Sequence, residues 1–164
     1  MAYSVRSLKP SDEPFLWEAL YQALYISPGV PPLPREIVQQ PELAKYVRDW
    51  KRDRDCGFVA ILKDSDIPIG AVWLRLFNRD NPGYGYIDDL TPELAIAILP
   101  EYRGQGIGTM LLAHLFEQVR FQYSAISLSV SAKNPALRLY HRLGFEVVKR
   151  ENHTLTMKKA LQEQ

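Results

Sequence analysis

The sequence predicts a three-layer α/β domain with a mixed sheet, because segments with strand periodicity alternate along the chain with helical segments. Short apolar or alternating runs recur from the first residues to the last. Amphipathic segments between them can supply helices for both faces of a sheet. With 164 residues, 46% of them hydrophobic, the chain has the size of one domain with a sizeable core. We therefore expect a single domain over residues 1–164.

The first half of the chain is expected to form the edge of this sheet and its first covering helices. Residues 3–8 alternate like a strand, and Ser11 or Asp12 can cap a helix over residues 13–25. Residues 26–34 contain four prolines and one glycine, which predicts an exposed loop. The remaining elements expected here are a helix over 41–51 and a hairpin of strands 58–62 and 69–77.

The second half is expected to place a long helix directly after a central strand. Residues 94–99 form an apolar run that ends at Pro100, and a helical pattern extends from Gly104 or Gln105 to about residue 121. An alternating strand over 126–130 follows, and then a helix that opens at Asn134. Strands over 145–150 and 154–158 close the sheet.

Charge and cysteine content exclude several classes of partner and location. Lys and Arg total 20 and Asp and Glu total 19, so no general attraction to nucleic acid or to an anionic membrane is expected. Cys56 has no cysteine with which to form an internal disulfide, and no leader or 18-residue apolar stretch is seen, so we expect a cytoplasmic protein. The three histidines lack metal-ligand spacing, so no metal is expected.

Residues 101–109 (EYRGQGIGT) are the most informative segment of the chain. Glycines between a strand and a helix let backbone N–H groups approach an anion, and the dipole of the next helix points at the same place. This pattern predicts a phosphate-binding turn. It is not a P-loop, because no lysine follows. It is not a dinucleotide fingerprint either, because Thr109 stands where glycine or alanine is needed and no acid lies about 20 residues further on.

Arg103, Gly106 and Gly108 do match Arg/Gln-x-x-Gly-x-Gly, which resembles the acyl-CoA pyrophosphate loop of the GCN5-related N-acetyltransferases (GNAT). Residues 134–145 also resemble that family's Asn-x-x-Ala-x-x-x-Tyr-x-x-x-Gly-Phe segment, although Pro135 and Ala136 replace the usual alanine spacing. The resemblance is specific over about residues 94–150. It implies a three-layer α/β/α fold whose central mixed, mostly antiparallel sheet is splayed at the cofactor site.

The resemblance further implies acetyl-CoA as the acyl donor. In the family, backbone N–H groups at the end of the central strand hold the pantetheine arm, a role that falls here to Ile98 and Leu99. Asn134 would hydrogen-bond the pantetheine region, with plain helix capping as the alternative. The cofactor-binding residues implied in this way are Ile98, Leu99, Arg103, Gly104, Gln105, Gly106, Ile107, Gly108, Thr109, Asn134 and Tyr140.

Two residues are candidates for acid and base catalysis. By its place in the motif, Tyr140 would protonate the leaving thiolate, and a phenol suits that task because it holds its proton at neutral pH. Its alternative role is to pack on the cofactor. Glu93 begins the central strand and shares a face with Ala95, where several family members carry the base. Asp88 and Asp89 are alternative candidates for the base. In a further alternative, all three acids are solvated side chains at the end of a loop and have no catalytic role.

The function implied is an acyl-CoA-dependent N-acetyltransferase that moves an acetyl group directly to a primary amine, carried by a small molecule or a peptide. The cluster of acids would favour a cationic amine. Tyr84 and Tyr86, with the loop over 26–34, are candidates to line an acceptor pocket. The alternative is a non-catalytic acyl-CoA-binding or sensing domain. Because dimers are common in the family, a homodimer stays open.

Overall fold

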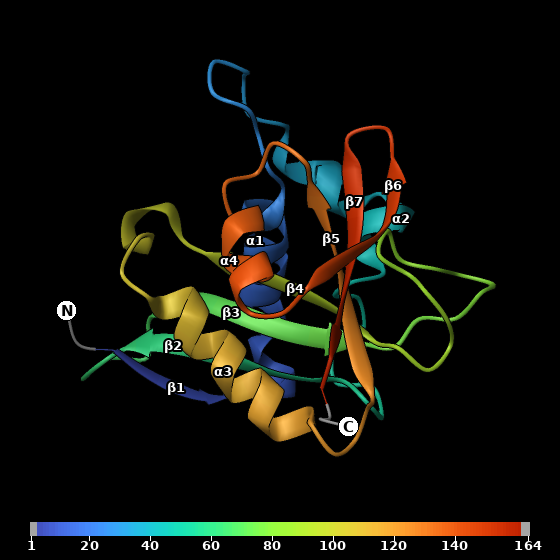
Figure 1. Ribbon diagram of the computed structural model, residues 1–164. Coiled ribbons are helices and arrows are strands. Elements are labelled where there is room, and N and C mark those ends of the chain that lie inside the picture. The colour runs from blue at the N-terminus through green and yellow to red at the C-terminus, as the bar shows by residue number, and fades with distance from the viewer. Residues whose placement is uncertain (1–2, 162–164) are drawn as a thin grey trace.

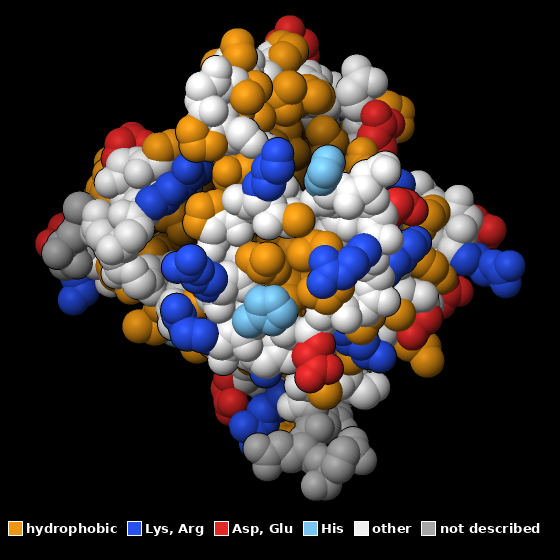
Figure 2. Space-filling view, turned by 45° about the horizontal axis from the view of Figure 1, so that its top comes forward, with side chains coloured by type: hydrophobic (Ala, Val, Ile, Leu, Met, Phe, Trp, Pro, Cys, Tyr) orange, Lys and Arg blue, Asp and Glu red, His pale blue; other side chains and the backbone are white. Residues whose placement is uncertain are grey.

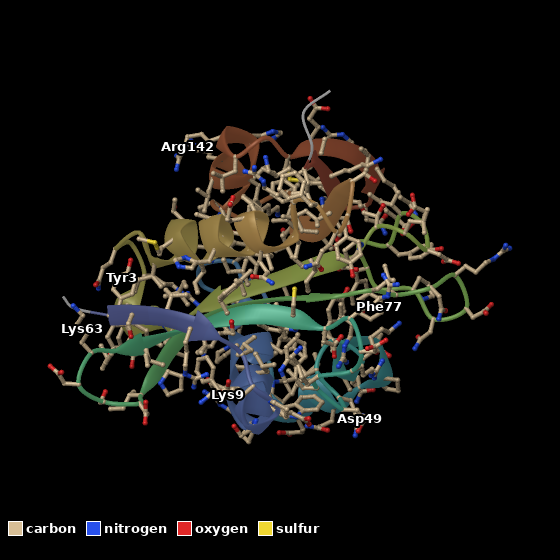
Figure 3. All side chains as sticks on the ribbon, turned by 90° about the horizontal axis from the view of Figure 1, so that it is seen from below. Tyr3, Lys9, Asp49, Lys63, Phe77 and Arg142 are labelled. Atoms are coloured by element: carbon tan, nitrogen blue, oxygen red, sulfur yellow. The ribbon has the colours of Figure 1, made fainter. Side chains whose placement is uncertain are left out.

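A seven-stranded mixed sheet forms the middle layer of the protein and is covered by helices on both faces, as a computed structural model of residues 3–161 shows (Figure 1). The strand order is β1-β2-β3-β4-β5-β7-β6. In Figure 3, Arg142 lies with α3 and α4 on one side of the sheet, and Lys9 and Asp49 lie on the other. This confirms the α/β class and the mixed, mostly antiparallel sheet expected from the sequence.

The strands are β1 (Tyr3–Ser7), β2 (Cys56–Leu62), β3 (Pro68–Arg75), β4 (Glu93–Ile98), β5 (Ala125–Ser131), β6 (Glu146–Glu151) and β7 (Thr154–Ala160). The α-helices are α1 (Glu13–Ala23), α2 (Pro41–Ala44), α3 (Ile107–Val119) and α4 (Leu137–Arg142). The 3₁₀ helices are η1 (Pro10–Asp12), η2 (Arg35–Gln39) and η3 (Pro100–Tyr102). None of the helices described in residues 3–161 has the length and apolar character needed to cross a membrane.

The sheet separates two apolar cores. Val72 and Leu74 of β3 face the core under α3, whereas Ala71 and Trp73 face the core under α1. This explains the nearly continuous apolar run of β3, because a central strand is buried on both faces and does not alternate with polar residues. The site described below lies between these two cores, where the sheet is open along β4 and β5.

One junction in the sheet is open. Every other strand pair is antiparallel, but β4 and β5 are parallel and pair only at Glu93 and Ser127. Ser127 N–H donates to Pro92 O at 2.9 Å, and beyond this point the two strands form no further ladder. The backbone edges of β4 and β5 therefore diverge toward the carboxyl end of β4.

The helix expected over residues 41–51 is wrong beyond α2, which ends at Ala44. The carbonyl groups that would continue it are taken by buried side chains of β3. Arg75 donates to the carbonyl oxygens of Lys45, Arg48 and Asp49, and Trp73 Nε1 donates to that of Tyr46. Residues 45–49 therefore form a series of turns around the Arg75 guanidinium.

Other differences concern where helices begin. Asp12 lies at the N-cap position of α1, as one of the two alternatives predicted, but its carboxylate accepts from Arg6 and from Lys9 N–H and forms no cap hydrogen bond with α1. The helix expected from Gly104 or Gln105 begins at Ile107, and that expected from Asn134 begins at Leu137. Strand β3 ends at Arg75, short of residue 77, and η2 forms where no element was expected.

Arg75 is a buried charge whose hydrogen-bonding capacity is fully used. Its side chain is 2% exposed, and it forms a two-pronged pair with Asp55, through Nε to Oδ1 at 3.1 Å and Nη2 to Oδ2 at 2.7 Å. With the three carbonyl oxygens, all five guanidinium N–H groups have acceptors. Asp55 also accepts from the backbone N–H groups of Lys51 and Arg52. This hydrogen-bond network fixes the backbone conformation of residues 45–52, which follow α2.

Arg75→Met is expected to lower the free energy of unfolding by about 3–5 kcal/mol, because it leaves the Asp55 carboxylate buried without its partner. Arg120→Met is the matched control, since Arg120 forms an exposed pair with Glu117 and should cost less than about 1 kcal/mol. Urea denaturation of both variants at neutral pH measures the difference. Equal losses would show that the buried network contributes no more than a surface pair.

Candidate active site

The opening between β4 and β5 leads into a cavity of about 880 Å³. Its lining comes from α1 and the loop after it, from β4 and β5, from the start of α3 and from α4. Figure 2 shows hydrophobic side chains in the recessed parts of this face of the molecule, with Lys and Arg side chains around them. The predicted site residues can be placed relative to this cavity one by one.

The glycine-rich turn at the start of α3 presents free backbone donors. Gly104 and Gly106 have φ angles of 76° and 82°, which turn successive N–H groups outward. The N–H groups of residues 104–109 meet no acceptor in the described part of the chain. A Cβ atom at Gly104 or Gly106 would meet no protein atom within 4 Å, so the space in front of the turn is open. Such a turn suits an anion.

Arg103 fastens this turn to the end of β4. Its Nε donates to Ile98 O at 2.9 Å, and its side chain lines the cavity. Gly108 also lines the cavity, and a Cβ there would come no nearer than 3.8 Å to Ile96. Protein packing therefore does not require glycine at position 108. Its small size instead keeps the cavity wide at the helix start.

The expectation that Leu99 offers a backbone donor to a ligand is corrected by the structure. Leu99 N–H donates to Ile69 O at 2.9 Å, at the end of the β3–β4 ladder. Because antiparallel strands direct alternate residues to opposite neighbours, the N–H groups of Ile98 and Ile96 point the other way, toward the opening. Both residues line the cavity, and Leu99 does not. The backbone N–H of Ile98 remains a candidate hydrogen-bond donor to a ligand, and the N–H of Ile96 is a candidate in place of that of Leu99.

Asn134 lies in the turn that precedes α4 and lines the cavity. Its Oδ1 accepts from Ala136 N–H at 2.9 Å, so this side chain shapes the turn as a cap would. The carbonyl half of the amide is therefore in use. Its amide N–H₂ group donates to no acceptor in residues 3–161 and is the part left for a ligand.

Tyr140 of α4 is 8% exposed and lines the cavity. The helix ends with Phe145 N–H donating to Tyr140 O and Gly144 N–H donating to His141 O, the two bonds of a Schellman motif. The rings of Tyr140 and Phe145 meet edge to face with centroids 5.9 Å apart. Burial raises the pKa of Tyr140 to about 12, so the phenol is neutral at physiological pH.

Glu93 lies at the start of β4, is 3% exposed and lines the same cavity. Its Oε2 accepts a hydrogen bond of 2.6 Å from Tyr46 O–H, and that hydroxyl accepts in turn from Tyr84 N–H at 2.8 Å. Ala95 and Ala97 share its face of β4, as the alternation predicted. Tyr46 thus holds one oxygen of the carboxylate in place.

The other oxygen of Glu93, Oε1, is buried against the backbone at Gly83 and Gly85 and forms no hydrogen bond of good geometry within residues 3–161, although Gly85 N–H lies close enough to lower the pKa of the carboxyl. Ser127 Oγ on the neighbouring strand is also buried without a partner. Burial raises the pKa of Glu93 to about 7, although the Tyr46 hydrogen bond opposes this shift. A carboxylate that lines a cavity and has a pKa near neutrality is suited to accept a proton.

The two alternative acids lie elsewhere. Asp88 and Asp89 are exposed and bind their own loop: Asp88 accepts from Leu90 N–H, and Asp89 accepts from Tyr86 O–H. Neither lines the cavity. Of the two tyrosines expected near an acceptor, Tyr84 lines this cavity, whereas Tyr86 lines only a separate one of about 320 Å³.

Tyr46 was missed as a site residue by the sequence analysis. It falls in the segment expected to form the helix over 41–51, and it is buried at 6% exposure. Nothing local in the sequence links position 46 to position 93. Within residues 3–161, no group of three or more His, Cys, Asp or Glu side chains is arranged to hold a metal ion.

Comparison with known proteins places the fold and the site in context. A family model described as the acetyltransferase (GNAT) family matches residues 17–145. The chain is 33% identical over 87 residues to the probable N-acetyltransferase san of Drosophila melanogaster. This match covers 51% of this chain and 44% of that protein. It is 41% identical over 63 residues to an N-alpha-acetyltransferase of Sulfurisphaera tokodaii, and this match covers 37% of this chain and 38% of that protein. The matches thus span less than half of either relative.

Solved structures share the fold over nearly the whole chain. The PaiA N-acetyltransferase of Thermoplasma acidophilum in complex with coenzyme A aligns with a TM-score of 0.69 at 19% identity, covering 98% of this chain and 99% of that one. The yncA putative acetyltransferase of Salmonella typhimurium with acetyl-CoA aligns with a TM-score of 0.65 at 17% identity, covering 100% and 96%. At these identities the likeness establishes the fold.

The raised pKa of Glu93 predicts a specific dependence of stability on pH. Between pH 4.5 and about 7 the folded protein binds a proton at Glu93 that the unfolded chain releases, so the free energy of unfolding falls as pH rises. The full loss, reached above pH 7, is about 3 kcal/mol. Glu93→Gln should abolish this slope.

Urea unfolding at pH 5, 6, 7 and 8 measures it, with Glu101→Gln as the control at an exposed acid. Wild type and Glu101→Gln should show the same fall, and Glu93→Gln a flatter curve. Parallel curves for wild type and Glu93→Gln would contradict a raised pKa at Glu93.

Proposed function

Because the chain belongs to the acetyltransferase (GNAT) family, we propose that it is an acyl-CoA-dependent N-acetyltransferase that moves an acetyl group directly to a primary amine. One observation carries the proposal. A single cavity combines Arg103 and Gly108 of the phosphate-type turn, the free edge of β4, a buried phenol at Tyr140 and a carboxylate at Glu93. These are the groups that transfer from a thioester to an amine requires.

The end of the cavity formed by the glycine-rich turn and the free edge of β4 fits a long phosphorylated ligand, which would be the acyl donor. The outward N–H groups of residues 104–109 would hold the pyrophosphate, with the positive end of the α3 dipole behind them. The N–H groups of Ile96 and Ile98 would bind the amides of the pantetheine arm along the strand edge. Acetyl-CoA, when bound, supplies the acetyl group as a thioester.

Glu93 would act as the base. An amine must lose its proton before it can attack, and the Glu93 carboxylate is the proton acceptor among the residues that line the cavity. Tyr46 would act as a positioning residue, because its hydroxyl donates to Oε2 and fixes the orientation of the carboxylate. The active form of Glu93 is the carboxylate, so turnover should rise with pH through about 7.

Tyr140 would act as the acid. Its hydroxyl is protonated at neutral pH and lines the same cavity as Glu93. The C–S bond breaks as the C–N bond forms, and the departing sulfur would take the phenol proton while Glu93 takes the proton of the amine. A non-catalytic acyl-CoA sensor would need the turn and the strand edge but neither of these two groups.

Gly106→Val should weaken CoA binding by at least about tenfold, because the side chain occupies the open space in front of the turn. Gly29→Val is the matched control: Gly29 has a φ angle of 84° and equally open surroundings, so the backbone strain is the same. Isothermal titration with CoA, acetyl-CoA, NAD and ATP measures the affinities. Unchanged CoA binding by Gly106→Val, or tighter binding of NAD than of acetyl-CoA, would overturn the donor site.

Tyr140→Phe should leave acetyl-CoA affinity nearly unchanged and lower turnover by about 10²–10⁴-fold, because it keeps the ring that packs on Phe145 and removes the proton donor. Tyr123→Phe serves as a control, since Tyr123 is a buried tyrosine of the same core outside the cavity. Pre-steady-state thiol release at saturating acetyl-CoA reports the chemical step. Equal rates for wild type and Tyr140→Phe would reduce Tyr140 to a packing residue.

A further inference from the structure

The cavity continues past Glu93 into a region walled by α1, the loop after it, η2 and α2. The large side chains there are apolar, and each is half-buried because one side faces the cavity. We call them the acceptor wall: Leu24, Tyr25, Ile26, Leu33, Ile37 and Leu43. Half-exposed apolar side chains grouped around a concave surface are typical of a site for an apolar ligand.

Three contacts stabilise the acceptor wall. Tyr21 O–H donates to Leu33 O and ties the loop back to α1, and Arg35 pairs with Glu18 of α1. The Arg35 guanidinium also lies over the Tyr21 ring, 4.6 Å from its centroid. The wall is therefore held by the fold and does not need a ligand to assemble it.

The wall offers few polar groups. The hydroxyls of Tyr21 and Tyr46 donate to Leu33 O and to Glu93, and the amide N–H₂ of Gln22 donates to Glu18. Tyr25 and Tyr84 supply the hydroxyls that have no acceptor in the described part of the chain. A peptide acceptor would bring several backbone N–H and C=O groups against this surface, and each one left without a partner is costly.

Charge is equally restricted. Among the residues that line the cavity, the charged side chains are Glu93 and Arg103, and Arg103 lies at the glycine turn. The acids Glu42 and Glu151 line the smaller neighbouring cavity together with two lysines, Lys45 and Lys149, and Lys149 pairs with Glu151. One carboxylate can compensate one ammonium. A second ammonium on the same acceptor would lie against the acceptor wall with no counter-charge.

We propose that the acceptor is a small monoamine, a single primary amine on an apolar body, and not a polyamine or a peptide. The amine lies at Glu93 and the apolar body packs on the acceptor wall. Burial of that body provides binding energy, and the single charge of the acceptor is matched by Glu93. This inference rests on the proposed N-acetyltransferase function and specifies its substrate class.

A matched pair of acceptors tests the proposal with the intact protein and acetyl-CoA. n-Hexylamine and 1,5-diaminopentane have nearly the same length and differ in one end group, methyl or ammonium. The wild type should favour n-hexylamine in kcat/KM by at least about 100-fold, because the second ammonium meets no counter-charge. A tetrapeptide amide with an N-terminal leucine forms the third arm.

Ile37→Glu places a second carboxylate in the acceptor wall and should reduce the preference for n-hexylamine by at least about tenfold. Val30→Glu is the control, because Val30 is 54% exposed in the same loop and lies outside the cavity lining. It should leave the preference unchanged. Thermal melting and CoA titration verify that both variants fold, since the glycine turn lies at the other end of the cavity.

The outcomes separate the two proposals. If 1,5-diaminopentane or the peptide is the better acceptor, or if Ile37→Glu and Val30→Glu behave alike, the monoamine inference is overturned while acetyl transfer stands. If CoA and acetyl-CoA bind but none of the three acceptors releases thiol, the monoamine inference fails by itself. The transferase proposal fails in favour of a sensor only if a broad panel of primary amines also releases no thiol. A preference for n-hexylamine that Ile37→Glu reverses or reduces supports both.

Discussion

The candidate site depends on the complete hydrogen bonding of one buried guanidinium. Arg75 uses every N–H group it has, and three of its acceptors are carbonyl oxygens of the turns that follow α2. Those turns have no helix to stabilise them, and Asp49 and Lys51 adopt positive φ angles of 58° and 80°. Because Arg75 and Trp73 hold this segment against β3, Tyr46 reaches across to Glu93. A structural ion pair thus orients a group used in the chemistry.

Glu93 illustrates the conflict between stability and reactivity at such a site. Burying a carboxylate that lacks a good hydrogen bond at one oxygen costs folding energy. A further hydrogen bond donated to the Glu93 carboxylate would reduce that cost. Such a bond would also lower the pKa of Glu93 and make it a weaker base. The surrounding sheet offsets this cost, because its central strand β3 is buried on both faces.

The sequence analysis succeeded where the signal is local. The turn at 103–109 and the strand before it carry their own pattern, and both lie where they were predicted, although α3 begins only after Gly106. The helix over 41–51 failed because its carbonyl oxygens bind Arg75, which is about 30 residues away in the chain. Leu99 failed as a donor because alternation says which residues share a direction, and only the β3–β4 register says which direction faces β5. Both errors concern long-range partners, which periodicity does not encode.

The single pairing between β4 and β5 has a consequence for cohesion. The sheet is in effect two antiparallel sheets, β1–β4 and β5–β7, joined at one rung and otherwise held together by the core under α3. A ligand that binds the free N–H groups of β4 and also contacts β5 and α4 would take the place of a missing strand and fasten the two halves to each other. The protein's melting temperature would then depend on the concentration of that ligand, and the β4 amides that face the gap would exchange their hydrogens more slowly when the gap is filled.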